Sequence, residues 1–171
     1  MKTMIEYLED MAQRESKIRA ALKRSLAFDL GTYPPVFQYI ERWIGEDDND
    51  WRRFVYYLVA GLWALQRRES RKGIGLKMTE AIRMFYFSNE QSPSVERRFI
   101  AILDADEGQL AYRLRQMIAL LKDYPIDFVD LLRDLLFWNH PDKLVQIKWA
   151  KIFYRNSVES NEAETINEKE N

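Results

Sequence analysis

The sequence predicts an all-α protein of two packed, bundle-like helical lobes, with no sheet. Two observations predict this fold class. Residues 94–155 form four amphipathic helical segments in a row, each with an apolar stripe and with arginines or lysines away from it. The most apolar stretch, residues 51–68, also has helical spacing. Residues 88–94 have the composition of a linker, which predicts an N-terminal lobe over residues 1–90 and a C-terminal lobe over residues 91–155.

The length and composition narrow the class of protein. A chain of 171 residues is long enough for one sizeable core or two small lobes, because it buries roughly 70% of its unfolded surface. It has no cysteine, which excludes disulfides and thiolate zinc sites and fits a reducing compartment. The charged N-terminal residues contain no apolar core of signal-peptide length, and no later run approaches about 18 uncharged apolar residues. We therefore expect a soluble, cytoplasmic protein without membrane association.

The charge is distributed unevenly along the chain. Residues 156–171 hold five Glu and one Lys, which leaves 25 basic and 22 acidic residues in the rest of the chain, although the whole chain has a net charge of -1. This segment has few large apolar side chains whose burial would offset the entropy of ordering it. The sequence thus predicts a mildly basic body followed by a disordered acidic tail.

Residues 4–26 predict one or two helices with Ile18, Leu22 and Leu26 on the apolar stripe. At 100° per residue, the opposite face receives four cations, with no acidic residue between them to relieve their repulsion. These cations are Lys17, Arg19, Lys23 and Arg24. A solvated face and an anion-binding site are the two interpretations, and the clustering favours the anion-binding site.

The next segments lead to a central helix. Residues 31–35 interrupt the helix, residues 36–44 form a short apolar segment, and residues 45–50 form an acidic loop. This loop lacks the alternating ligands and terminal Glu of a calcium-binding EF-hand, whereas its carboxylates suit the start of a helix. Residues 51–68 are predicted to be a buried central helix. Its aromatic residues Tyr56, Tyr57 and Trp63 are predicted to belong to the core rather than to stack on bases.

Residues 67–77 are rich in cations and contain two glycines. Without a preceding strand, this Gly-x-Gly pattern does not indicate a dinucleotide site. The segment is interpreted either as an exposed basic connection or as a mobile arm that closes on a phosphate backbone. A short helix over residues 79–87 follows it.

In the C-terminal lobe, Ser94 is expected to cap one helix and Pro125 to start another. The helix between them, residues 107–122, has the most regular apolar stripe of the chain. Arg115 and Lys122 lie about 20° apart on its other side and about 10.5 Å apart along its axis, which suits a surface that tracks phosphates. Arg113 lies at the edge of the stripe, where we expect it to snorkel or to pair.

Beyond Pro125, Asp130 is expected to face outward and to pair with Arg133 three residues later. The only histidine, His140, lies in a turn, where a cap or surface role is expected rather than that of a general base. The last helix packs through Val145, Trp149, Ile152 and Phe153. It also places three cations within about 60° of one another: Lys148, Lys151 and Arg155.

The sequence contains no arrangement typical of an enzyme. No nucleophile lies beside a base, no carboxylates converge, and no set of metal ligands is present, so we expect no catalysis, no cofactor and no metal. Basic stripes on helices with aromatic groups nearby are instead what sequence-independent contact with a nucleic-acid backbone needs.

Three motifs in the C-terminal half carry a family resemblance. They are SVERRF, ILDADEGQLAYRLRQMIALLK and PIDFVDLLRDLLFWNHPDKLVQIKWAKIFY. Through them the chain resembles the CasB small-subunit family of the type I-E CRISPR Cascade complex. The segments AALKRSLA and GIGL extend the resemblance into the N-terminal half, so that it covers roughly residues 15–155.

The resemblance implies a non-catalytic subunit that pairs with a second copy of itself and contacts the large and backbone subunits of the complex. It also implies contact with CRISPR RNA and with the displaced single-stranded DNA of an R-loop, which nearly balanced energetics allow protein contacts to stabilise. The binding residues implied by matching motif positions are Lys23, Arg24, Arg97, Arg98, Arg113, Arg115, Lys148 and Lys151. The alternative is a structural helical adaptor whose basic faces meet acidic protein partners.

Overall fold

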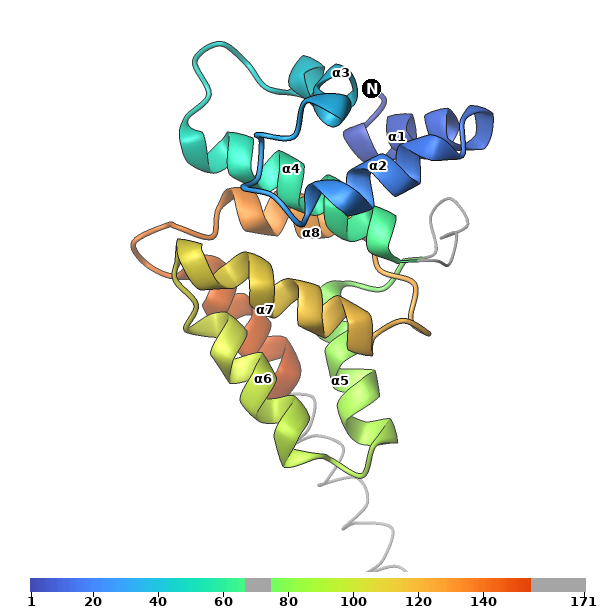
Figure 1. Cartoon of the computed structure of the whole chain (residues 1–171). Helices are drawn as coiled ribbons and strands as arrows, with labels where there is room; N and C mark the ends of the chain where they lie inside the picture. Colours follow the sequence, from blue (N-terminus) through green and yellow to red (C-terminus); the bar gives the residue numbers. More distant parts are fainter. Residues whose placement is uncertain (67–74, 155–171) are drawn as a thin grey trace, which may run out of the picture.

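The computed structural model describes residues 1–66 and 75–154, and the elements in these ranges are helical. The predicted all-α class is therefore confirmed (Figure 1). The only β-type pairing in the described ranges is an isolated parallel bridge between Leu76 and Ile126. The elements are α1 (Met4–Arg14), α2 (Lys17–Ser25), the 3-10 turn η1 (Pro34–Val36), α3 (Phe37–Ile40), the 3-10 turn η2 (Glu41–Trp43), α4 (Asp50–Leu65), α5 (Met78–Ser88), α6 (Pro93–Leu103), α7 (Glu107–Leu120) and α8 (Phe128–Leu136), followed by a helix over residues 144–154.

Side-chain caps explain where several helices begin. Asn49 accepts a hydrogen bond from the backbone N–H of Arg52 at the start of α4, and Asp106 accepts one from Gln109 at the start of α7. Such bonds satisfy backbone donors that have no partner within the helix. Asn49 and Asp106 therefore act as caps. Asp50 lies in the first turn of α4, where the sequence predicted that a carboxylate would suit the helix start.

Two predicted helix starts were wrong. Helix α6 begins at Pro93, and Ser94 lies inside it, because the fixed φ of proline suits the first helical position. Helix α8 begins at Phe128 rather than at Pro125. The carbonyl of Pro125 instead accepts a hydrogen bond from the N–H of Leu76 (2.8 Å), and Asp127 caps α8.

Helix α4 is the centre of the fold, as predicted. Its residues from Tyr57 to Ala64 are all buried, and it packs against α1, α2, α3, α7 and α8. In Figure 1, α2 lies in front of α4 and α8 lies beneath it. Tyr57 and Trp63 belong to the core, as predicted from their spacing, and Tyr56 packs against it while partly exposed.

The two predicted lobes share this core. Helix α4 of the N-terminal part packs against α7 and α8 of the C-terminal part, and α5 packs against α6. Buried side chains form one cluster that runs from Met4 to Phe153. The division at residue 90 stays a prediction, but the core runs continuously through both parts.

The end of α4 is tied to the segment between α7 and α8 by polar contacts. The buried side chain of Gln66 accepts a hydrogen bond from the N–H of Ile126 (3.0 Å) and donates one to the carbonyl of Tyr124 (2.7 Å). The N–H of Asp127 donates to the carbonyl of Leu76 (2.8 Å). These bonds leave no room at Gly75, where an added Cβ would lie 2.6 Å from the backbone nitrogen of Asp127.

We predict that Gly75→Ala lowers the free energy of unfolding by about 1–3 kcal/mol, because the methyl group meets backbone that has no free space to move into. Gly108→Ala is the matched control. Its Cβ would meet no atom closer than 3.4 Å, and alanine favours the helix by about 1 kcal/mol. Urea unfolding measures both effects, and a Gly75→Ala variant as stable as the wild type would contradict this packing.

Candidate nucleic-acid interface

Helix α2 presents free cations on the face turned away from the core. It buries Ile18 and Leu22, and it packs against α4. Lys23 and Arg24 are exposed, and within the described residues neither has an acidic partner. Both lie in the last turn of α2, where positive charge also interacts favourably with the helix dipole.

The other two predicted cations of this helix are in different surroundings. Lys17 is exposed and pairs with Glu15 at 3.4 Å. Arg19 does not lie on the free face. Its guanidinium donates to the carbonyls of Trp63 (3.2 Å) and Gln66 (2.6 Å) at the end of α4, and it lies 4.0 Å from the centre of the Trp63 ring. Arg19 thus caps α4, whose last carbonyls lack partners within the helix.

Helix α7 brings a cation of the C-terminal part to the end of α2. Leu110, Leu114 and Met117 are buried, as the predicted stripe requires, and Arg115 is exposed on the other side. Its guanidinium donates to the carbonyl of Leu26, the residue that ends α2, at 3.3 Å. Arg115 is therefore a close neighbour of the last turn of α2, although 89 positions separate it from Leu26 in the sequence.

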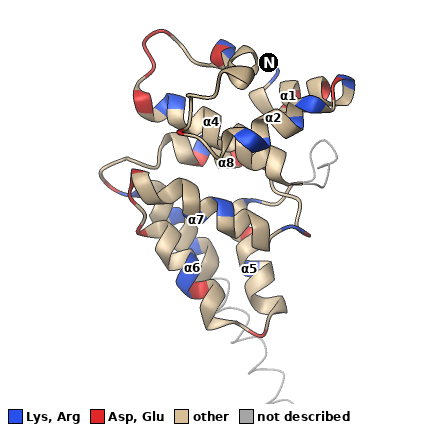
Figure 2. Cartoon of the chain, in the orientation of Figure 1, with Lys and Arg blue, Asp and Glu red and all other residues tan. Residues whose placement is uncertain are grey.

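Gln116, the residue after Arg115, makes two further hydrogen bonds, one within α7 and one to α6. Tyr112, one helical turn before Arg115, accepts a hydrogen bond at its hydroxyl from Gln116 (2.6 Å). Gln116 in turn accepts one from Arg98 of α6 (3.4 Å). We call the set Lys23, Arg24, Arg98 and Arg115 the α2–α7 surface. Figure 2 shows basic residues on α2, α6 and α7, the three helices that contribute to it.

Two predicted site residues, Arg113 and Lys122, are not part of this surface. Arg113 donates a hydrogen bond to the carbonyl of Ala101 near the end of α6, so it pairs, as expected for a cation at the edge of the stripe. Lys122 is exposed but follows the end of α7, which is at Leu120 rather than at residue 122. Arg97 is also exposed, next to Arg98 on α6.

The last helix passes behind α6 and α7 in Figure 1 and packs against α6, where the ring of Phe153 stacks on that of Phe99. Lys148 pairs with Asp134 of α8, and the second carboxylate oxygen of Asp134 accepts a hydrogen bond from the indole of Trp149 (2.7 Å). Lys151 is exposed. Arg155, the basic segment over residues 67–74 and the acidic tail lie outside the described residues.

The prediction for Asp130 was half right. It pairs with Arg133 at 3.4 Å, as expected, but it does not face outward, because it is only 9% exposed. Asp130 and Asp134, four residues apart, both lie on the buried side of α8. Burial, together with the neighbouring Asp134 carboxylate, raises the pKa of Asp130 above its ordinary value.

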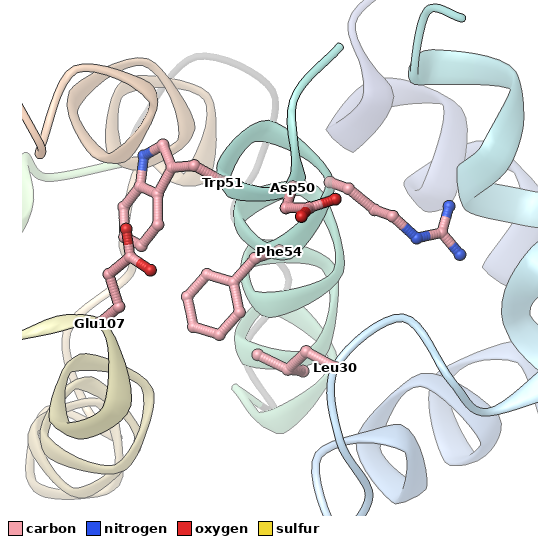
Figure 3. Close-up of a pocket in the computed structure, with 6 residues that line it drawn as sticks. Leu30, Asp50, Trp51, Phe54 and Glu107 are labelled. Carbon is pink, nitrogen blue, oxygen red and sulfur yellow. The ribbon is translucent and has the colours of Figure 1, made fainter.

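A pocket of about 310 Å³ lies between the start of α4, Leu30 and the start of α7 (Figure 3). Trp51 and Phe54 stack along one side of it, with ring centres 5.2 Å apart. Asp50 and Glu107 line it as well, and so does Arg53, whose guanidinium pairs with Glu41. Its two carboxylates make the pocket a poor site for phosphate, so it is not counted as part of the α2–α7 surface.

Three further features of the described residues concern a metal site, the single histidine and a membrane-spanning helix. They contain no group of three or more His, Asp or Glu side chains arranged to hold a metal ion. The ring nitrogen Nδ1 of His140 accepts a hydrogen bond from the N–H of Asp142 (3.2 Å), so it caps its own turn, as predicted. Over residues 1–66 and 75–154, no helix combines the length and the apolar character needed to cross a bilayer.

Sequence reasoning missed the exposed aromatic residue beside the free cations. Phe28 follows the end of α2 and is 46% exposed. It belongs to no helical stripe, so periodicity did not single it out. Its position two residues after the motif residue Leu26, in a turn beside a basic helix, is the signal that could have found it.

Cations of α2 that donate to backbone carbonyls and cations that have no partner among the described residues are expected to differ in their contribution to stability. Arg19→Ala should lower the free energy of unfolding by about 1–3 kcal/mol, because it leaves two backbone carbonyls at the end of α4 without a donor. Lys23→Ala on the same helix should change it by less than about 0.5 kcal/mol. Urea unfolding of both variants measures this difference, and equal effects would contradict the assignment of Arg19 as a cap.

A pH-dependent effect is expected at Asp130. Since its folded-state pKa is raised, the native state binds this proton more tightly than the unfolded chain does, so ionisation of Asp130 costs stability as the pH rises toward neutrality. Asp130→Asn should therefore raise the free energy of unfolding at pH 7. The gain should shrink as the pH falls toward the ordinary Asp pKa of about 3.9. Exposed Asp29→Asn is the control, and an Asp130→Asn variant that is less stable at pH 7 would contradict the role of burial.

Comparisons with a protein-family model, with a related sequence and with a solved structure identify the same family. The family model for the CRISPR-associated protein Cse2 matches residues 18–154. A CRISPR-associated protein Cse2 from Thermus thermophilus is 43% identical over 139 residues, which cover 80% of this chain and 78% of that protein. The fold is also similar to the crystal structure of M. ruber CasB, with a TM-score of 0.78 and 38% identity over 94% of this chain and 98% of the other.

Two further structures share the fold. CasB from Thermus thermophilus gives a TM-score of 0.77 at 38% identity, over 88% of this chain and 95% of the other. A chain of a CRISPR RNA-guided surveillance complex gives a TM-score of 0.74 at 20% identity, over 94% of this chain and 99% of the other. The similarity therefore extends over both predicted lobes.

Proposed function

The chain belongs to the CRISPR-associated protein Cse2 family, and from this membership we propose that it is a non-catalytic, nucleic-acid-binding subunit of a CRISPR surveillance complex. In this proposal it contacts CRISPR RNA and the other subunits, pairs with a second copy of itself, and stabilises the displaced DNA strand of the R-loop in the cytoplasm. The site proposed to do so is the α2–α7 surface.

The observation that carries the proposal is the hydrogen bond from Arg115 to the carbonyl of Leu26. Arg115 reaches the end of α2, whose last turn carries Lys23 and Arg24, and this supports a surface on which a strand of phosphates meets several cations. Contacts of this kind supply affinity that depends on salt and hardly on sequence. A displaced strand of arbitrary sequence needs such a surface.

The energetics of R-loop formation suit a surface of modest size. The RNA–DNA heteroduplex is about as stable as the DNA duplex that it replaces, so a few contacts to the displaced strand shift the balance. Cations that are already paired contribute less to such binding. For this reason Lys148, which its motif position grouped with the binding residues, is left out of the tested set, because it pairs with the buried Asp134.

We predict that replacing Lys23, Arg24 and Arg115 together with Ala weakens binding to single-stranded DNA and flattens its dependence on salt. The slope of log K against log salt concentration should fall by about 0.7 for each phosphate that the variant no longer binds. Fluorescence anisotropy of a labelled oligonucleotide at several salt concentrations measures this slope.

The matched control replaces three cations that each have an acidic partner: Lys2, Arg52 and Arg133. It changes the net charge by the same amount as the first variant. Because its three cations are already paired with carboxylates, its salt slope should stay near that of the wild type. Equal losses of affinity in both variants would mean that only the net charge matters. A wild-type protein without salt-dependent binding would overturn the proposal and favour an adaptor that meets acidic protein partners.

A further inference from the structure

Phe28 is exposed but held in a fixed orientation. Its ring stacks on that of Tyr33, with ring centres 4.7 Å apart and planes inclined by only 12°. Tyr33 is itself partly buried and packs against the core. The stack covers one face of the Phe28 ring, so its 46% exposure belongs to the other face and the edge.

The backbone fixes Phe28 beside the free cations. The N–H of Phe28 donates to the carbonyl of Ser25 (3.2 Å), and the N–H of Ala27 donates to that of Arg24 (3.0 Å). The Cα atom of Phe28 therefore lies within roughly 7 Å of that of Leu26. The carbonyl of Leu26 is the one that accepts the hydrogen bond from Arg115.

We propose that Phe28, held against Tyr33, is a base-stacking residue that takes an unpaired base of the strand whose phosphates lie on Lys23, Arg24 and Arg115. This inference rests on the proposed function and deepens it. An aromatic platform beside a cationic track is the combination that binds single-stranded nucleic acid without sequence preference, because every base has a π-face. A ring that is already oriented loses little conformational freedom when the base arrives.

The inference makes the ligand a single strand rather than a duplex. In a duplex the faces of the bases are covered by their neighbours, so the ring of Phe28 has nothing to stack on. Tyr112, the other exposed aromatic residue of this region, makes no ring contact within the described residues, and its hydroxyl is held by Gln116. We therefore assign stacking to Phe28 alone.

The test compares three labelled strands of equal length: a thymidine DNA, a uridine RNA, and a DNA backbone of abasic sites. Phe28→Leu keeps the apolar volume but removes the π-face. It should weaken binding to the base-bearing strands by about 5- to 150-fold, leave the abasic strand unaffected, and keep the salt slope of the wild type. Phe28→Trp should bind the base-bearing strands as tightly as the wild type. Comparison of the thymidine DNA with the uridine RNA determines which of the two strands the Phe28 ring prefers.

The control is Ile147→Ala, since Ile147 is a similarly exposed apolar residue (47%) on the last helix, and its affinities should equal those of the wild type. If Phe28→Leu binds all strands like the wild type, or weakens binding to the abasic strand equally, stacking is wrong although the proposed function stands. If the wild type binds no strand, the proposed function fails, and the stacking role of Phe28 fails with it.

Discussion

Helix α4 is apolar on almost every side, and this property decides how the other helices pack. A helix of this kind cannot lie on the surface, so segments from both halves of the chain cover it. Gly61 lets α2 approach closely, because an added Cβ would lie 2.4 Å from a methyl carbon of Leu26. The same contact fixes the position of Leu26, which is the residue that receives Arg115. Burial in the core thus determines where the cations of α2 and α7 meet.

The cations of this protein divide by what they contact. Arg19 and Arg113 donate to carbonyls at the ends of neighbouring helices, and Lys148 pairs with a buried carboxylate, so these three stabilise the fold. Lys23 and Arg24 have no such partner among the described residues, and they remain available to phosphates. Arg115 does both, since one bond to Leu26 leaves most of its five donors unused. The proposed interface therefore consists of cations that keep unused hydrogen-bond donors in the folded protein.

The sequence predicted the fold class, the central helix and the stripe of α7, because helical periodicity reports directly which side of a helix is buried. It did not predict the start of α8, since the pairing of Pro125 with Leu76 joins residues far apart in the chain. For the same reason Arg19 could not be separated from Lys23 and Arg24, because its partners are backbone carbonyls of another helix. Arg113 was separated from them, because its place at the edge of the stripe predicted that it would snorkel or pair. Phe28 was missed because a residue in a turn has no periodicity, and only the fold reveals the ring of Tyr33 beneath it.

In the proposed function, one surface built from α2 and α7 receives the strand. Photocrosslinking of the whole chain to a single-stranded oligonucleotide that carries photoactivatable thymine analogues shows where the strand lies, with the crosslinked peptides identified by mass spectrometry. We expect crosslinks in the segment from Lys23 to Phe28 and in the part of α7 around Arg115. Crosslinks confined to the last helix, around Lys148 and Lys151, would contradict the claim.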